Sequence, residues 1–388
     1  MLPHDPKLLY RRIEAAIERA RGPGSPRRFA ERLLAHVVAE LGAPAGVRCA
    51  QLYERRDGAF RRLRQEGEDT PDLSAELARR LAPPGSARSE LPWAGDTAAG
   101  PAALIAVGEV DDLVMSLCFG PEAPCPDAER LALASPLHYA VLQHLRRREL
   151  EDVIEQAHAI QTSLLPSGPP AFDDFDIAAS SRPARRVGGD LFDFLPLDAD
   201  TLGIAVADAS GHGLPAALQV RDVATGLRMG VERDLRITRT IEKLNRVIHR
   251  SGLTSRFVSL VFAELERNGN LLYVNAGHPP PLLLDDAGLR ELSVGGTLLG
   301  PYPDTVYKMG FAHVDRGAAL LFYTDGVIER RAPDGTMFGR ERLAGWLGRW
   351  RDRTASEALA DLAAALEAFA GGPPPEDDVT AVLVRRPR

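Results

Sequence analysis

The stretch Val187-Gly188-Gly189-Asp190-Leu191-Phe192-Asp193 places a carboxylate after two glycines and a second carboxylate three residues later. A similar acidic turn, Ala-Asp-Ala-Ser-Gly-His-Gly, occupies residues 207–213. Two more lie far downstream, at residues 324–326 (Thr-Asp-Gly) and 377–380 (Asp-Asp-Val-Thr). In each case a short run of strand-forming residues adjoins a turn that carries an aspartate. If the four strand ends converge, their carboxylates form a site for two hard divalent cations.

The residue types in these turns suit Mg²⁺ or Mn²⁺, because both ions prefer oxygen ligands. Glycine beside an aspartate allows a sharp turn, so a backbone carbonyl as well as the carboxylate can face a cation. Two such ions can activate one water and clamp a phosphate for in-line attack. A carboxylate between two cations stays ionised because its pKa is lowered. This chemistry needs neither a thiol nor a Ser-His-Asp arrangement.

Length and composition predict a globular protein with about two or three domains, since the chain has 388 residues of which 45% are hydrophobic. The net charge of -7 argues against a general nucleic-acid-binding surface. Three cysteines, Cys49, Cys118 and Cys125, are too few for a disulfide framework or a zinc site, so we expect ordinary packed or surface thiols in a reducing compartment. We find no signal-peptide pattern and no membrane-spanning apolar stretch. These features predict a cytoplasmic protein.

Residues 1–134 show the order helix, hairpin, helix, hairpin, followed by a final helix. The predicted elements are helices at 7–20, 25–41 and 72–81, a hairpin at 47–64, loops at 83–101, and strands at 102–107 and 113–119. This order resembles a GAF or PAS-type sensory domain, in architecture only. A small-molecule sensor and a scaffold without a ligand both remain open.

Residues 135–168 carry the longest continuous helical pattern, over 136–165. Its apolar positions alternate in steps of three and four, which is the spacing of a coiled-coil seam: Leu150, Val153, Ala157, Ile160 and Leu164. The exposed flank, residues 146–152, is strongly charged. We therefore predict a signalling rod that forms a homodimer, the alternative being a helix packed on its own domain.

Residues 169–388 change to a pattern rich in short strands. The predicted strands lie at 176–180, 193–197, 201–207, 257–264, 271–275, 281–284, 289–292, 318–323 and 379–385, and the helices at 214–229, 237–250, 340–350 and 356–370. Many antiparallel strands with two pairs of helices predict an α+β fold in which two antiparallel sheets face each other with the helices outside.

The motifs of this region together are much more specific than any one of them. They are VGGDLFDF (187–194), DASGHGLPAAL (208–218), NAGHPPPLL (275–283), YTDGVIE (323–329), MFGRERL (337–343) and DDVT (377–380). In this combination the sequence closely resembles the SpoIIE-like, RsbU-type branch of the metal-dependent PPM protein phosphatases. The helix ending in Ala-Ile-Gln-Thr-Ser-Leu-Leu-Pro (159–166) is similar to the one that leads into that domain. The resemblance covers roughly residues 155–388 and implies the PPM-type α/β sandwich.

The resemblance also implies a set of metal ligands: Asp190, Asp208, the backbone carbonyl of Ala209, Asp325 and Asp377. Asp190 and Asp208 would bind or bridge the two central ions, and Asp325 and Asp377 would complete the site. Asp377 ranks above Asp378 as a ligand. Ala209 departs from the Val or Gly that relatives often carry, but a carbonyl contribution does not depend on the side chain. Asp193 would contact a metal or its water, or else make a structural hydrogen bond.

Several other polar residues near the motifs have a functional and a structural interpretation. His212 could donate a proton, but in a Gly-His-Gly turn we favour a role in positioning that turn, and we expect His278 to be structural. Arg182, Arg185 and Arg186 precede the first motif. Arg186 is the candidate for binding substrate phosphate, while the alternative is ordinary surface charge in an arginine-rich chain.

From these observations we expect a Mg²⁺- or Mn²⁺-dependent phosphoserine/phosphothreonine protein phosphatase controlled by its N-terminal domain. The resemblance implies a phosphorylated STAS-type anti-anti-sigma factor as its substrate, in a bacterial partner-switching pathway. Two alternatives remain. One is a phosphatase-like regulatory module that binds a partner without turnover. The other is a two-metal hydrolase of nucleotides or nucleic acid, against which the acidic balance argues.

Overall fold

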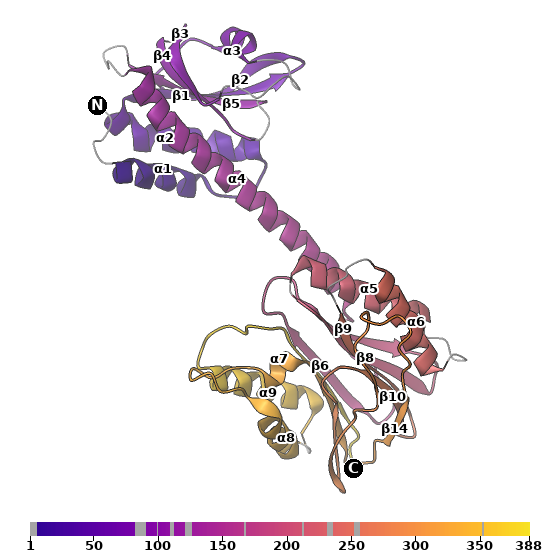
Figure 1. Cartoon of the computed structure of the whole chain (residues 1–388). Coiled ribbons are helices and arrows are strands. Elements are labelled where there is room, and N and C mark those ends of the chain that lie inside the picture. The colour runs from indigo at the N-terminus through magenta and orange to yellow at the C-terminus, as the bar shows by residue number, and fades with distance from the viewer. Residues whose placement is uncertain are drawn as a thin grey trace. The chain divides into compact units, whose positions relative to one another are not determined.

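The computed structural model describes residues 6–81, 91–98, 100–108, 112–120, 126–166, 168–211, 213–230, 236–251, 257–350 and 353–388. Two residues singled out above, Cys125 and His212, lie outside these ranges. The chain forms two compact units, Met1–Asp152 and Val153–Arg388, shown in Figure 1. No helix in the described ranges has the length and apolarity to cross a membrane.

The N-terminal unit is built on one antiparallel sheet with the strand order β2-β1-β5-β4-β3. The strands are β1 (Val47–Arg56), β2 (Ala59–Gly67), β3 (Trp93–Thr97), β4 (Gly100–Ala106) and β5 (Leu113–Phe119). Helices α1 (Pro6–Ala20), α2 (Pro26–Ala45) and the first part of α4 (Asp127–Leu164) cover one face with a continuous apolar core. Whether this unit is of the GAF or PAS type stays a prediction.

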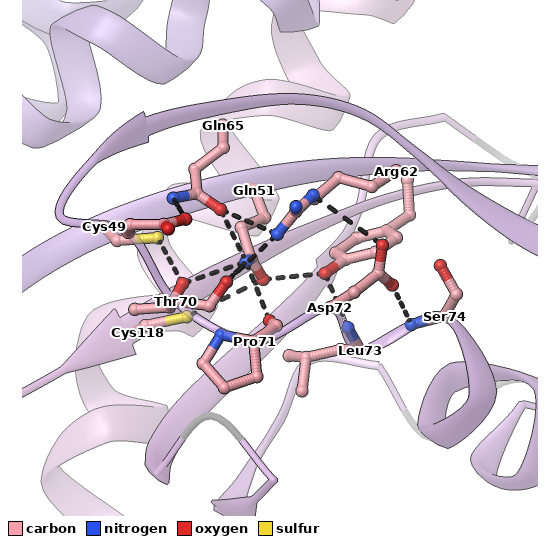
Figure 2. A network of polar contacts seen from close by, with 12 residues as sticks. Cys49, Gln51, Arg62, Gln65, Thr70, Pro71, Asp72, Leu73, Ser74 and Cys118 are labelled. Atoms are coloured by element: carbon pink, nitrogen blue, oxygen red, sulfur yellow. Dashed lines mark hydrogen bonds and ion pairs between the residues drawn. The ribbon is translucent and has the colours of Figure 1, made fainter.

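The opposite face of this sheet is half apolar and half polar. Helix α3 (Ser74–Arg80) covers the apolar half. In the polar half, shown in Figure 2, the Gln51 side chain donates to Thr70 Oγ1 at 2.9 Å and accepts from the Tyr53 hydroxyl at 2.7 Å. Cys49 and Cys118 lie in this network as free, buried thiols. The two described cysteines are thus packed thiols, as predicted.

Helix α4 runs from Asp127 to Leu164, beginning in the N-terminal unit and ending in the C-terminal one. The helix starts earlier than predicted. Pro136, which we expected at its beginning, lies inside it. The chain divides into its two compact units between Asp152 and Val153, within this helix. The domain boundaries predicted from the sequence, at 134/135 and 168/169, remain a prediction.

The C-terminal unit contains two sheets. The first is ordered β13-β10-β9-β8-β7, with β14 also paired to β10, and the second is ordered β12-β11-β15-β16-β6. Their strands are β6 (Asp176–Arg182), β7 (Asp190–Pro196), β8 (Thr201–Ala209), β9 (Val258–Glu266), β10 (Asn270–Ala276), β11 (Leu282–Asp285), β12 (Gly288–Glu291), β13 (Gly295–Gly296), β14 (Gly310–His313), β15 (Ala319–Tyr323) and β16 (Val379–Arg385). All these pairings are antiparallel except β10 with β13.

Three apolar cores hold this unit together as four layers. The central core lies between the sheets and includes Phe194 of the first sheet and Phe322 of the second. Helices α5 (Leu214–Gly230) and α6 (Ile237–Arg250) pack on the first sheet, and α8 (Gly339–Trp350) and α9 (Ala355–Ala370) pack on the second. Figure 1 shows these pairs of helices on opposite sides of the two sheets. The predicted α/β sandwich is confirmed.

Four elements were absent from the prediction: β3, β13, β14 and the short helix α7 (Asp325–Ile328). The first three are edge strands rich in glycine or short, so their own residues carry little strand signal. Helix α7 is a single turn, and the sequence pattern over four residues cannot separate it from an Asp-Gly turn.

Candidate metal centre

Asp190 and Asp208 face each other across neighbouring strands. Asp190 is the first residue of β7, and the antiparallel register pairs it directly with Asp208 of β8. Paired residues in adjacent antiparallel strands lie about 4.5–5.5 Å apart at Cα. The strand ends predicted from sequence therefore meet, and two of the four expected carboxylates come from one sheet.

Asp325 comes from the second sheet. It directly follows Thr324, whose side chain contacts the first sheet. Thr324 is the residue before α7, but its side chain does not cap that helix. Its hydroxyl instead donates to Asp190 Oδ2 at 2.8 Å and accepts from the Thr380 backbone N–H at 3.0 Å. This one side chain ties β7 to the ends of β15 and β16, with Asp325 as the next residue.

Asp377 and Asp378 precede β16 and have different surroundings. Asp377 accepts only the Asp378 backbone N–H, at 2.8 Å, among the contacts the structure gives its side chain. The Asp378 carboxylate is buried and accepts backbone N–H groups from Ala184, at 2.7 Å, and Gly189. Asp378 thus holds the turn before Asp190, which supports ranking Asp377 above it as a ligand.

Glycine is required at two places where the backbones of these turns approach closely. A Cβ at Gly189 would lie 2.8 Å from the carbonyl oxygen of Ala209 and 3.5 Å from Asp208 Oδ1. A Cβ at Gly326 would lie 2.0 Å from the carbonyl oxygen of Asp378. Glycine at these two positions therefore lets the acidic turns of both sheets come together.

Burial and neighbouring negative charges raise the pKa values of three of these carboxyl groups. Burial, followed by repulsion from Asp208, raises the pKa of Asp190 well above its usual range, although hydrogen bonds from Thr380 and Thr324 act in the opposite direction. Burial, then repulsion from Asp325 and Asp377, raises the pKa of Asp208 to about 8. Burial and then Asp377 raise the pKa of Asp325 to about 6. The four predicted acidic ligands therefore form one interacting cluster.

The donor set fits hard cations. Its members supply only carboxylate and carbonyl oxygens, and the raised pKa values mean that nearby positive charge would stabilise the ionised forms. Among the described residues no group of three or more His, Cys, Asp or Glu side chains could by itself hold a metal ion. Mg²⁺ commonly takes only one or two carboxylates and keeps several waters. The residues therefore fit Mg²⁺ or Mn²⁺ bound through few protein ligands.

Asp193 lies apart from this cluster. Its buried carboxylate forms an ion pair with Arg228 of α5, at 2.9 Å and 3.2 Å, and also accepts the Phe194 N–H. Of the two interpretations offered by the sequence, these contacts support the structural one.

His278, Arg182 and Arg186 have polar partners outside the set of predicted ligands. His278 is buried, its Nδ1 lies 2.8 Å from Ser259 Oγ, and burial lowers its pKa to about 3, so it is neutral. Arg186 forms an exposed ion pair with Glu155 at 3.2 Å, and Arg182 pairs with Glu367. A substrate role for Arg186 stays a prediction.

Two contributing residues, Thr324 and Gln161, were missed by the sequence analysis. Thr324 stands beside Asp325 in the quoted motif, so the motif pointed to its place but not to its bond with Asp190. Gln161, in the last turn of α4, contacts Gly188. No local pattern in the sequence connects a residue in a helix to a turn 27 residues away.

Comparison with known proteins identifies the C-terminal unit. Residues 198–387 match the family described as Stage II sporulation protein E (SpoIIE). "Phosphoserine phosphatase RsbU" of Bacillus subtilis (strain 168) is 30% identical over 192 residues, which are 49% of this chain and 57% of that protein. The chain thus spans about half the length of the curated relatives it matches.

Solved structures agree on the fold. The "SiaA-PP2C domain of Pseudomonas aeruginosa" superimposes with a TM-score of 0.54 at 22% identity, over 62% of this chain and 98% of that one. "The crystal structure of the RsbU and RsbW domains of Rv1364c from Mycobacterium tuberculosis" gives a TM-score of 0.50 at 28% identity, over 58% and 64%. The sandwich has the fold of a PP2C-type domain. Within that class, this chain carries a SpoIIE-type domain with RsbU and RsbP as homologues.

Because Asp193 pairs with Arg228, we expect substitution of Asp193 to lower the stability of the protein without weakening metal binding. We expect Asp193→Asn to lower the free energy of unfolding by about 1.5–3 kcal/mol, because charge-assisted hydrogen bonds to a buried group are removed. Denaturant unfolding and Mn²⁺ titration of the same variant measure both quantities. The control is Asp222→Asn, which removes the exposed partner of Arg221 and should cost less than about 1 kcal/mol. A large loss of Mn²⁺ affinity in Asp193→Asn would instead place Asp193 among the ligands.

The raised pKa values predict that the metal-free protein loses stability as the pH rises. The folded chain retains protons on Asp325 and Asp208 up to about 6 and about 8, respectively, whereas the unfolded chain loses them near about 4. Since the folded state binds more protons over this interval, the free energy of unfolding falls with increasing pH. Thermal melts in chelator should show this decline, and Mn²⁺ should raise the melting temperature more at about pH 8 than at about pH 6.

Asp208→Asn is the control for this pH dependence, because the amide does not titrate. Its melting temperature in chelator should decline less steeply with pH than that of the wild type. Identical profiles for the two proteins would contradict the assignment of the decline to Asp208.

Proposed function

We propose that this chain is a Mn²⁺- or Mg²⁺-dependent protein phosphatase that hydrolyses phosphoserine or phosphothreonine. The observation that carries the proposal is the convergence of Asp190, Asp208, Asp325 and Asp377 from both sheets into one interacting cluster. The family match and the name of the relative "Phosphoserine phosphatase RsbU" support the same reaction.

In this proposal the ligands are Asp190, Asp208, the Ala209 carbonyl, Asp325 and Asp377. When bound, the two cations would lower the pKa of an attacking water and place positive charge next to the phosphoryl group. The chain's own residues hold the acceptors in place. The Thr324 hydroxyl orients Asp190, and the Asp378 carboxylate holds the turn before it through Gly189. Because these contacts are preformed, little reorganisation is required when the metals bind.

For the substrate we propose a phosphorylated STAS-domain anti-anti-sigma protein, on the resemblance to RsbU-type regulators. Control by the N-terminal unit is part of the proposal. One proposed route passes through α5 and α6, which follow the Asp208 motif. Helix α5 packs on the sheet that contains Asp208, since its Ala216 and Val220 share a core with Ala207 and Ala209. A shift of α5 would therefore move Asp208 and the neighbouring carbonyl.

The test is phosphate release from a phosphoserine STAS protein, from p-nitrophenyl phosphate and from a nucleotide, with Mn²⁺ and with chelator. Asp208→Asn should reduce turnover by at least about a hundredfold, because it removes a charged metal ligand. Asp222→Asn, on the exposed surface of α5, is the control and should retain activity. Activity on the nucleotide alone would favour another two-metal hydrolase. Binding of the STAS protein without turnover, even with residues 1–150 removed, would favour a docking module.

We further propose a homodimer through α4. Of the predicted seam residues, Leu150, Val153 and Ile160 are 64%, 47% and 60% exposed, so the protomer leaves them without apolar cover. The side chain of Leu164 lies outside the described part of the chain. A coiled-coil partner would bury this stripe. Val153→Glu should shift the protein from dimer to monomer in analytical ultracentrifugation, whereas Glu151→Gln, on the charged flank, should not. A wild-type monomer at all concentrations tested would contradict the dimer.

A further inference from the structure

The side-chain amide of Gln161, in the last turn of α4, binds both backbone groups of Gly188. Gln161 Nε2 donates to the Gly188 carbonyl at 2.7 Å, and the Gly188 N–H donates to Gln161 Oε1 at 3.1 Å. Paired bonds to the N–H and C=O of one residue are what a neighbouring antiparallel strand provides. The amide therefore stands in for a strand next to the residues that lead into β7.

The turn that Gln161 binds is the one that delivers Asp190. On its other side, Asp378 accepts the Gly189 N–H, and a Cβ at Gly188 would lie only 2.5 Å from Asp378 Oδ2. The Gly189 carbonyl accepts the Ala209 N–H at 2.9 Å. The turn is thus held from three directions, by Asp378, by β8 and by α4. Only the last of these three contacts comes from a helix.

We propose that Gln161 is a positioning residue that holds the Gly188–Asp190 turn in its metal-binding geometry and couples this turn to α4. The inference rests on the proposed function, because it assigns Asp190 to the metal site. Helix α4 begins at Asp127 in the N-terminal unit. Its last turn carries Gln161, so unwinding or rotation of that turn would act on the segment that contains Asp190. This route does not pass through α5 and α6.

A second contact between α4 and the same segment is much weaker. Glu155 pairs with Arg186 at 3.2 Å, but both side chains are more than half exposed, at 65% and 61%. Exposed ion pairs contribute little because water and salt screen them. The Gln161 amide is half-buried and its two bonds converge on a single residue. It is therefore the contact through which a change in α4 would reach the turn.

The decisive variant is Gln161→Met, which keeps the length of the side chain and removes both hydrogen bonds. We expect its Mn²⁺ affinity, measured by titration calorimetry, to fall by about tenfold. Turnover should recover at high Mn²⁺, because the ligands themselves are intact. Gln156→Met is the matched control on the exposed face of the same helix, and its affinity should stay within about twofold of wild type. Equal affinities in the two variants would overturn the proposal.

Hydrogen exchange in the metal-free protein separates this inference from the proposed function. In Gln161→Met the backbone amides of Gly188 and Gly189 should exchange faster than in wild type and in Gln156→Met, whether or not the protein binds Mn²⁺ or hydrolyses phosphate. A wild type that binds no Mn²⁺ would defeat the proposed function and, with it, the metal-positioning role. Unchanged exchange at both glycines would overturn the inference by itself. If Gln161→Met does not fold, Gln161→Glu replaces it, since a carboxylate keeps the acceptor for the Gly188 N–H and loses the donor.

Discussion

The gathering of negatively charged carboxylates at the ends of both sheets is the constraint on which the rest of the C-terminal unit depends. Burial raises the pKa values of Asp190, Asp208 and Asp325, and the charges of neighbouring carboxylates from both sheets raise them further. Such a cluster is costly unless hydrogen bonds or positive charge offset it. Hydroxyl groups of Thr324 and Thr380 act on Asp190. The negative charge that these hydrogen bonds leave uncompensated makes the cluster suitable for cations.

Two polar side chains and two glycines of the scaffold keep this cluster in place. Thr324 connects Asp190 to the strand ends of the second sheet, and Asp378 connects the same turn to β16. Close approach of the turns is possible because Gly189 and Gly326 have no side chains. Behind these turns, a helical pair packs on each sheet and an apolar core fills the space between the sheets. The geometry of the candidate site is therefore a consequence of how the two sheets meet.

The acidic residues of the motifs do different work although they look alike in the sequence. Asp378 uses its carboxylate to bind backbone N–H groups, and Asp193 uses its own to bind Arg228. Both are buried and have their acceptors occupied by donors from the protein. Asp208 and Asp325 have their pKa values raised chiefly by burial and by other carboxylates. This difference in partners, rather than position in a motif, separates structural acids from candidate ligands.

The sequence by itself determined the sandwich, its two helical pairs and the acidic residues at its strand ends, because alternating apolar residues and Asp-Gly turns are local signals. It did not determine β3, β13, β14 or α7, whose few residues take their conformation from neighbouring strands and turns. Only the tertiary structure decided that Asp193 pairs with Arg228, that Thr324 binds Asp190, and that Gln161 binds Gly188. Each of these contacts joins residues 27 or more positions apart, and the partner of a polar side chain at such distances is set by packing rather than by local pattern.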